Sequence, residues 1–163
     1  MSRRSRTIVA VLAALVALVV GVRARYPGQA PTALPAGDCD SDLWKHVYDQ
    51  KRLRVVEACT AVEGRVIRVH RAQDGDVHIE LDPDSKSVLN VMNLLHVNGH
   101  LVVEVICEHA AEEAEAKDAC ADHVPRVTIP NRGDRVRVTG AYVTDLHNRW
   151  NEIHPVTRIE VLH

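Results

Sequence analysis

The stretch that most constrains the fold is the run 133–162, which reads as two β-strands joined by a short polar loop, residues 145–150. In the first strand, Val136, Val138 and Tyr142 alternate with polar side chains. A period of two indicates a strand with one buried face and one face in water. In the second strand the same alternation predicts that the wet face carries Glu152, His154, Arg158 and Glu160.

Two residues that fit regular strands poorly are expected at irregular positions. Pro155 cannot donate a hydrogen bond to a neighbouring strand, so we expect it at a strand edge, a bulge or a corner. Gly64 stands in the middle of the valine-rich strand 53–70. A glycine there predicts a bulge, at which the long strand bends and serves both halves of a barrel.

The rest of the chain supplies further strands and short helices. Strands are expected at 53–70, 76–82 and 101–107. Helices are expected at 42–50, within the insertion 83–99, and at 108–122. The strand 101–107 is apolar on both faces except at Glu104, which predicts that both faces are covered. The element order predicts an all-β fold with minor α structure, a five-stranded OB-fold-like barrel with a helix between its third and fourth strands.

Residues 1–25 are predicted to be a targeting segment, because a basic start precedes the uncharged apolar run 8–22. As a helix this run spans about 23 Å against a hydrocarbon core of about 30 Å. Two readings stay open: an uncleaved transmembrane anchor and a cleaved signal peptide. More positive charge precedes the run than follows it. We therefore expect a single-pass membrane protein with its C-terminal domain outside the cytoplasm, or a secreted protein after cleavage.

Residues 26–38 hold three prolines and two glycines, which predicts an extended, mobile linker and leaves 39–163 as one extracytoplasmic domain. From residue 26 onward, 15 basic residues stand against 22 acidic ones, a net charge of -7 with histidines neutral. An acidic domain repels phosphate backbones, which argues against general nucleic-acid binding.

Four cysteines, at 39, 59, 107 and 120, predict disulfides outside the cytoplasm, and four cysteines allow three pairings. We favour Cys39 with Cys59 and Cys107 with Cys120, since each pair closes a local loop around one predicted helix. No two of them have the short spacing of a zinc-binding cysteine pair.

Five segments of the run 39–162 resemble a family of bacterial exported OB-fold proteins that has no established activity. They are Leu43-Trp44-Lys45-His46-Val47-Tyr48, Asp74-Gly75-Asp76-Val77-His78, Leu101-Val102-Val103-Glu104, Val138-Thr139-Gly140-Ala141-Tyr142-Val143 and Trp150-Asn151-Glu152-Ile153-His154-Pro155. The last motif, Trp-x-Glu-Ile-His-Pro, is fairly specific. The resemblance implies an OB fold and a place outside the cytoplasm.

The candidate site lies at the loop between the last two strands. Its candidate binding residues are Asp145, His147, Trp150, Glu152 and His154. His147, Glu152 and His154 are also candidate ligands for a zinc ion, since strand residues at i and i+2 point the same way. In the structural alternative, Trp150 fills the barrel end, His154 hydrogen-bonds a carbonyl or carboxylate, and Glu152 pairs with an arginine. His78 is expected to lie too far from His154 to join it.

The sequence favours a membrane-tethered or secreted binding module for an envelope protein or a small ligand, with no catalytic residue and no cofactor other than the candidate zinc. A metal-dependent hydrolase with its site at the same loop is the alternative. A nucleic-acid-binding OB domain is a second one, for which Arg65, Arg68, Arg135 and Arg137 form a candidate basic stripe unless nearby acids balance them.

Overall fold

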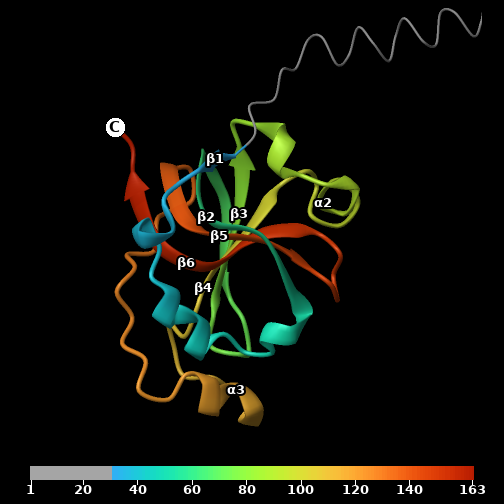
Figure 1. Ribbon diagram of the computed structural model, residues 1–163. Helices are drawn as coiled ribbons and strands as arrows, with labels where there is room; N and C mark the ends of the chain where they lie inside the picture. The colour runs from blue at the N-terminus through green and yellow to red at the C-terminus, as the bar shows by residue number, and fades with distance from the viewer. Residues whose placement is uncertain (1–30) are drawn as a thin grey trace, which may run out of the picture.

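The computed structural model describes residues 31–163, so the predicted targeting segment lies outside the described residues. Within 31–163, none of the helices combines the length and the apolar character needed to cross a membrane. The described chain is mostly β-strand with few, short helices (Figure 1). The strands are β1 (Thr32–Ala33), β2 (Leu53–Arg71), β3 (Val77–Pro83), β4 (Leu101–Val105), β5 (Arg135–Asp145) and β6 (Asn151–Val161). The helices are η1 (Ala36–Asp38), η2 (Ser41–His46), η3 (Gln50–Arg52), η4 (Lys86–Val88), α2 (Val91–His96) and α3 (Ala114–Ala119).

Five of the strands pair in a closed ring. The antiparallel pairs are β2 with β3, β3 with β4, β5 with β6, and β2 with β5. The ring closes through one parallel pair, in which Val102 of β4 lies beside Glu152 of β6. Apolar side chains from every strand of the ring fill its interior, among them Val66, Ile79, Leu81, Val103, Val138 and Ile153.

The strand β2 pairs with β5 along Leu53–Arg65 and with β3 from Gly64 onward, so it serves two neighbours as predicted. The bulge predicted at Gly64 is wrong in position. The register of β2 shifts against β3 between Val66 and Arg68, and against β5 between Val55 and Thr60. At Gly64 the backbones pack closely instead, because a Cβ atom there would lie 2.4 Å from the carbonyl oxygen of Asp82.

Pro155 lies at a bulge, which was one of the three positions predicted for it. Gly140 of β5 pairs with Val156, whereas Tyr142 pairs with Ile153, so β6 carries an extra residue across this step. The peptide bond between His154 and Pro155 is cis. Gly140 is required opposite the bulge, because a Cβ atom there would lie 2.5 Å from the carbonyl oxygen of Pro155.

The two disulfides join the predicted pairs, Cys39 with Cys59 and Cys107 with Cys120. The predicted linker, residues 26–38, ends earlier than expected. Residues 31–38 belong to the folded domain, since β1 pairs with Thr60 and Ala61 of β2. The disulfide from Cys39 to Cys59 of β2 lies next to this antiparallel pairing and holds the segment against β2.

The predicted helices form in shorter versions. The run 108–122 is helical only over α3, because the backbone N–H groups of Glu112 and Glu113 donate to the carbonyl of Gln73 in the β2–β3 turn. In place of the helix predicted at 42–50, the chain forms the 3-10 helix η2, and the separate 3-10 helix η3 begins only at Gln50. Asp40 caps η2 by accepting from the N–H of Asp42 at 2.9 Å. The helix η2 leads into Val47, which packs on Ile106 and Cys107 after β4.

The close approach at Gly64 predicts a large cost for a side chain there. Gly64→Ala places a methyl group against backbone atoms of Asp82 and Pro83, and we expect it to lower the free energy of unfolding by about 3 kcal/mol. Urea denaturation measures this change. Gly37→Ala is the matched control, since a Cβ atom there meets nothing within 4 Å, and it is expected to change stability by less than about 0.5 kcal/mol. Equal stability of the two variants would contradict the packing described.

Candidate functional site

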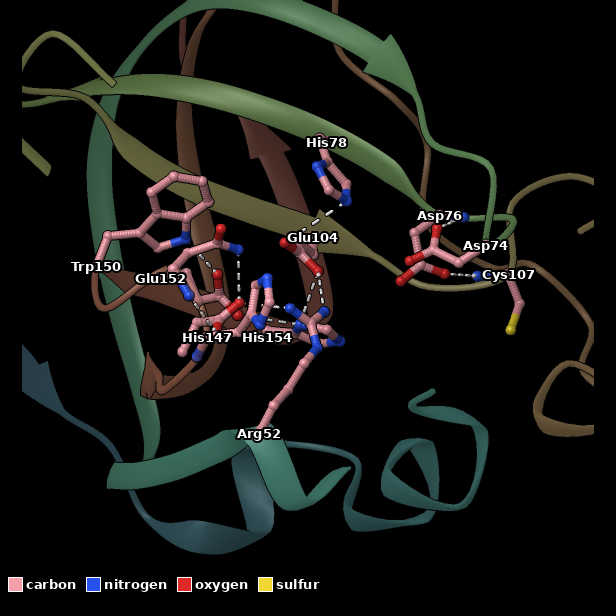
Figure 2. Close-up of polar contacts among 12 residues, drawn as sticks. Arg52, Asp74, Asp76, His78, Glu104, Cys107, His147, Trp150, Glu152 and His154 are labelled. Carbon is pink, nitrogen blue, oxygen red and sulfur yellow. Dashed lines mark hydrogen bonds and ion pairs between the residues drawn. The ribbon is translucent and has the colours of Figure 1, made fainter. Parts of the chain in front are cut away.

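The predicted site residues of β6 lie on the outer face of the ring, yet they are buried. Ile153 of β6 and Val103 of β4 point into the core, so their neighbours Glu152, His154 and Glu104 point outward. The exposed fractions of these three residues are only 0%, 1% and 1%. The prediction of a wet face at Glu152 and His154 is therefore wrong. Figure 2 shows what covers them: Arg52, just before β2, and the loop between β5 and β6.

Glu104 and His154 form the central contact of this buried group. The Nδ1 atom of His154 lies 2.8 Å from Oε2 of Glu104 and 3.2 Å from Oε1 of Glu152. Trp150 donates from Nε1 to Oε2 of Glu152 at 2.8 Å. The Trp-x-Glu-Ile-His motif therefore forms a chain of hydrogen bonds that ends on Glu104 of the neighbouring strand.

A second chain of contacts joins the β5–β6 loop to the start of β2. Asp145 accepts hydrogen bonds from the N–H groups of His147 at 2.6 Å and Asn148 at 3.0 Å. Its other oxygen, Oδ2, pairs with Arg52, whose Nη2 lies 3.4 Å from Oε2 of Glu104. Asp145 thus fixes the shape of the loop, and Arg52 links the loop to Glu104.

The proximity of these charges shifts their pKa values. Burial alone would lower the pKa of His154, but the carboxylates of Glu104 and Glu152 outweigh it and raise that pKa to about 10. Burial would raise the pKa of Glu104, but His154, His78 and Arg52 lower it to about 2. Burial and the nearby Glu104 raise the pKa of Glu152. Glu104 is therefore the carboxylate held ionised beside an imidazolium.

Asp76, in the turn before β3, is a further buried carboxyl beside this group. Its Oδ1 accepts from the backbone N–H of Cys107 at 2.8 Å. Burial, together with the neighbouring Asp74, raises its pKa to about 7. Asp76, Glu104 and His154 each offer a possible metal-ligand atom, and these atoms all lie within 4.8 Å of one another. We call the buried charge cluster the set Arg52, Asp76, Glu104, Asp145, Glu152 and His154.

The structure brings together four of the five predicted binding residues, namely Asp145, Trp150, Glu152 and His154. His147 stays in the exposed part of the loop, with its backbone N–H on Asp145. The expectation for His78 is confirmed: β4 lies between β3 and β6, and no direct contact joins His78 to His154 among the described residues. Glu104 bridges the two histidines, with Oε1 3.5 Å from Nε2 of His78.

The structural alternative is confirmed for His154, which contacts carboxylates. It is wrong for Glu152, which was expected to pair with an arginine, since Arg52 pairs with Glu104 and Asp145 instead. Three members of the cluster were not candidates in the sequence: Arg52, Asp76 and Glu104. Glu104 had a usable signal, because it is the one charged side chain in an otherwise apolar strand. Asp76 lies in one of the five segments that carry the family resemblance, but nothing there marks it as buried. Arg52 had no signal, since it stands among other charged residues.

A cleft of about 370 Å³ has none of the cluster residues in its lining. Its walls come from η2, from the residues just after β4, from the run 122–127 and from β6. One oxygen of Glu108, Oε1, is buried there without a hydrogen-bond partner among the described residues. Burial raises the pKa of Glu108. We call this feature the Glu108 cleft.

The candidate basic stripe is balanced by acids, as its alternative predicted. Arg137 donates to Oε1 of Glu63 at 2.6 Å, and Arg135 donates to Oε2 of the same residue at 3.1 Å. Arg68 pairs with Glu80 at 3.2 Å. Hydrogen bonds from Arg137 and Arg135 hold the pKa of Glu63 below its usual value. These contacts offer few free cations to a phosphate backbone.

Comparison of the chain with protein-family models and with curated proteins gave no match.

The central contact predicts a large cost when Glu104 loses its charge. Glu104→Gln leaves His154 and Arg52 without their shared anion, and removing one partner of a buried ion pair costs about 3–5 kcal/mol. We expect a loss of this size in the free energy of unfolding, measured by urea denaturation at pH 7. The control is Glu160→Gln, also next to a basic residue but exposed, with an expected cost below about 1 kcal/mol. A cost below that limit for Glu104→Gln would show that the contact contributes little.

Proposed function

We propose that the protein is an extracytoplasmic binding module built on an OB-fold barrel, which holds a cationic group of its ligand in the Glu108 cleft. The unpartnered carboxylate oxygen of Glu108 carries this proposal. A buried acceptor without a partner is costly. Because Oε1 is inaccessible to solvent, the partly exposed side chain of Glu108 must turn before a ligand can donate an N–H group to it, and the new hydrogen bond then removes the cost. The ligand is a primary amine or guanidine on an apolar body, such as a basic side chain of an envelope protein.

The strand order supports the OB-fold assignment. In the ring, β4 and β6 are parallel, and α3 lies between β4 and β5 in the chain. This is the order of the five-stranded Greek-key barrel of the OB class. The resemblance carried by the Trp-x-Glu-Ile-His-Pro motif points to the same class and stays a prediction.

The proposed localisation outside the cytoplasm rests on the N-terminal sequence and on the disulfides. Residues 1–25 read as an anchor or a signal peptide, and all four cysteines are paired. Disulfides persist in oxidising compartments. The module is therefore tethered to the cell membrane, or secreted if the segment is removed.

The walls of the cleft are preorganised. Cys39 precedes Asp40 in one wall, and Cys107 stands between Ile106 and Glu108 in another, so each disulfide braces a wall. A site held in its bound shape loses less conformational entropy on binding. The cavity volume also lies in the usual range for small-ligand sites, about 300–1,000 Å³.

The charges of the cleft favour a cation. Four carboxylates line it against the single guanidinium of Arg126, and one of the four, Asp42, pairs with Lys45 at 2.6 Å. The lining acids are Asp40, Asp42, Glu108 and Asp122. A second cavity, of about 470 Å³ beside β1, contains Arg137 and Glu63, which already pair with each other. The free acceptor and the excess of acids therefore favour the Glu108 cleft.

Burial disfavours the alternative of a metal-dependent hydrolase at the β5–β6 loop. Catalytic groups must touch the substrate, whereas Glu152 and His154 are covered by Arg52 and Trp150 (Figure 2). Access to these two side chains would require the loop to open.

The proposal predicts selective binding of amines. Titration of the full-length protein with butylamine, followed by backbone amide NMR, is expected to give saturable shifts at Ile106, Glu108 and Val124, which line the cleft. Butanol, which has the same apolar tail without the charge, is expected to give weaker shifts. A hydrogen bond to a charged group contributes about 1.5–3 kcal/mol, so Glu108→Gln should weaken butylamine binding roughly tenfold or more.

Glu112→Gln is the matched control, because it removes the same charge from an exposed residue four positions along the chain. It should change the affinity less than about twofold, since exposed charges are screened by solvent and salt. Equal shifts with butanol and butylamine, or unchanged binding in Glu108→Gln, would refute the proposed site.

A further inference from the structure

The helix α2 turns its polar side toward the protein and its apolar side toward solvent. Val91, Leu94 and Leu95 share one face of the helix and are 62%, 59% and 70% exposed. Asn93, on the opposite side, is fully buried. A surface helix normally shows the reverse, with its apolar stripe toward the core. We call Val91, Leu94 and Leu95 the apolar face of α2.

Hydrogen bonds hold α2 in this orientation. Nδ2 of Asn93 donates to the carbonyl oxygens of His100 at 3.1 Å and Asn151 at 2.9 Å, and its Oδ1 accepts from the N–H of Asn151 at 3.0 Å. Asn90 caps the helix and donates from Nδ2 to the carbonyl oxygen of Arg149 at 3.0 Å. Turning the helix to bury its leucines would break these contacts. The apolar face is therefore a fixed feature of the surface.

The described chain begins beside this helix. Pro31 lines the same cavity as Asp84 and Val88, and α2 starts three residues after Val88. Figure 1 shows β1 next to the end of β3, from which the chain leads into α2. A tether attached before Pro31 therefore holds the end of the domain that carries α2.

The length of chain before Pro31 keeps this end close to a membrane. The apolar run 8–22 is the predicted anchor, and the residues 23–30 separate it from Pro31. Fully extended, that segment spans at most about 28 Å. In the membrane-tethered form of the proposed function, on which this inference rests, α2 is thus within reach of the lipid surface.

The charge around α2 suits a lipid surface better than the rest of the domain does. From residue 26 onward, 15 basic residues stand against 22 acidic ones, yet the run 85–103 contains no acidic residue. Arg149, whose carbonyl contacts Asn90 at the start of the helix, is exposed. Anionic lipid headgroups attract basic side chains and repel acidic ones. This face can therefore approach a bilayer that the rest of the domain avoids.

We propose that the apolar face of α2 inserts into the interface of the bilayer that holds the tether, with Arg149 at the level of the lipid phosphates. Helices that lie on membranes present apolar side chains to the acyl chains and basic ones to the headgroups. A second copy of the chain fits less well, because three side chains do not supply the roughly 800 Å² per partner that a stable protein interface buries.

This contact would orient the domain on the membrane. The helix α2 leads into the start of β4, whereas Ile106 and Glu108 of the Glu108 cleft follow the end of β4. The cleft and the apolar face of α2 therefore lie at opposite ends of that strand. With α2 on the bilayer, the cleft faces away from it, toward ligands in the extracytoplasmic space.

The test uses the full-length protein in nanodiscs of phosphatidylcholine and phosphatidylglycerol, in which some lipids carry a gadolinium chelate on the headgroup. The paramagnetic ion broadens the NMR signals of nearby groups. We expect loss of the methyl signals of Val91, Leu94 and Leu95. The signals of Val124 should persist, because this residue is 65% exposed but lines the Glu108 cleft. Persistent α2 signals in discs that hold the protein would overturn the proposal.

A pair of variants checks that the apolar face makes the contact. Leu95→Asp changes an exposed residue, and is expected to restore the methyl signals of Val91 and Leu94, since a charged side chain is costly to place in lipid. Val124→Asp is the matched control and should leave those signals lost. Signals that stay lost in Leu95→Asp, or return in Val124→Asp, would also overturn the proposal.

Failure of this inference can be told apart from failure of the proposed function. Protein that does not co-elute with the nanodiscs lacks the tether, and the tethered form and this inference then fail together. Protein that co-elutes but keeps sharp α2 signals overturns this inference alone. Butylamine binding at Glu108 is measured separately and depends on neither result.

Discussion

Glu104 and His154 meet across the parallel strands that close the ring, and the other contacts of the charge cluster depend on this pair. Two buried charges are costly to desolvate, and the cost is offset only when both are paired and hydrogen-bonded. Glu104 meets that condition through His154 and Arg52, and His154 through Glu104 and Glu152. Each contact also ties a separate segment to the sheet. The loop between β5 and β6 and the turn before β2 are thereby held over the same patch.

The domain separates its buried charges from its accessible ones. The cluster is covered by Arg52 and the β5–β6 loop, so its charges contact one another and not solvent. The Glu108 cleft is open to solvent and lies between segments braced by the two disulfides. This division supports binding at the cleft and a structural role for the cluster.

The five strands of the ring could be predicted because side-chain alternation is a local property of each segment. The disulfide pairing could be predicted for a similar reason, since each bond closes a short loop. The helix at 108–122 was overestimated, because Glu112 and Glu113 give their N–H groups to Gln73, a residue far along the chain. Gly64 was assigned to a bulge, whereas the reason for glycine is the approach of Asp82 on another strand. Both errors arise from contacts between segments distant in sequence.

The sequence by itself determined the β-rich class, the order of strands and helices along the chain, the cysteine pairs and a loop with a Trp-x-Glu-Ile-His motif. It also determined which way Glu152 and His154 point, because alternation along a strand fixes the face. Only the tertiary structure decided that this face is covered, that Glu104 stands between His78 and His154, and that Arg52 completes the group. The physical reason is that burial and charge pairing depend on which strands become neighbours. A parallel contact between β4 and β6 leaves no mark on either strand's own pattern.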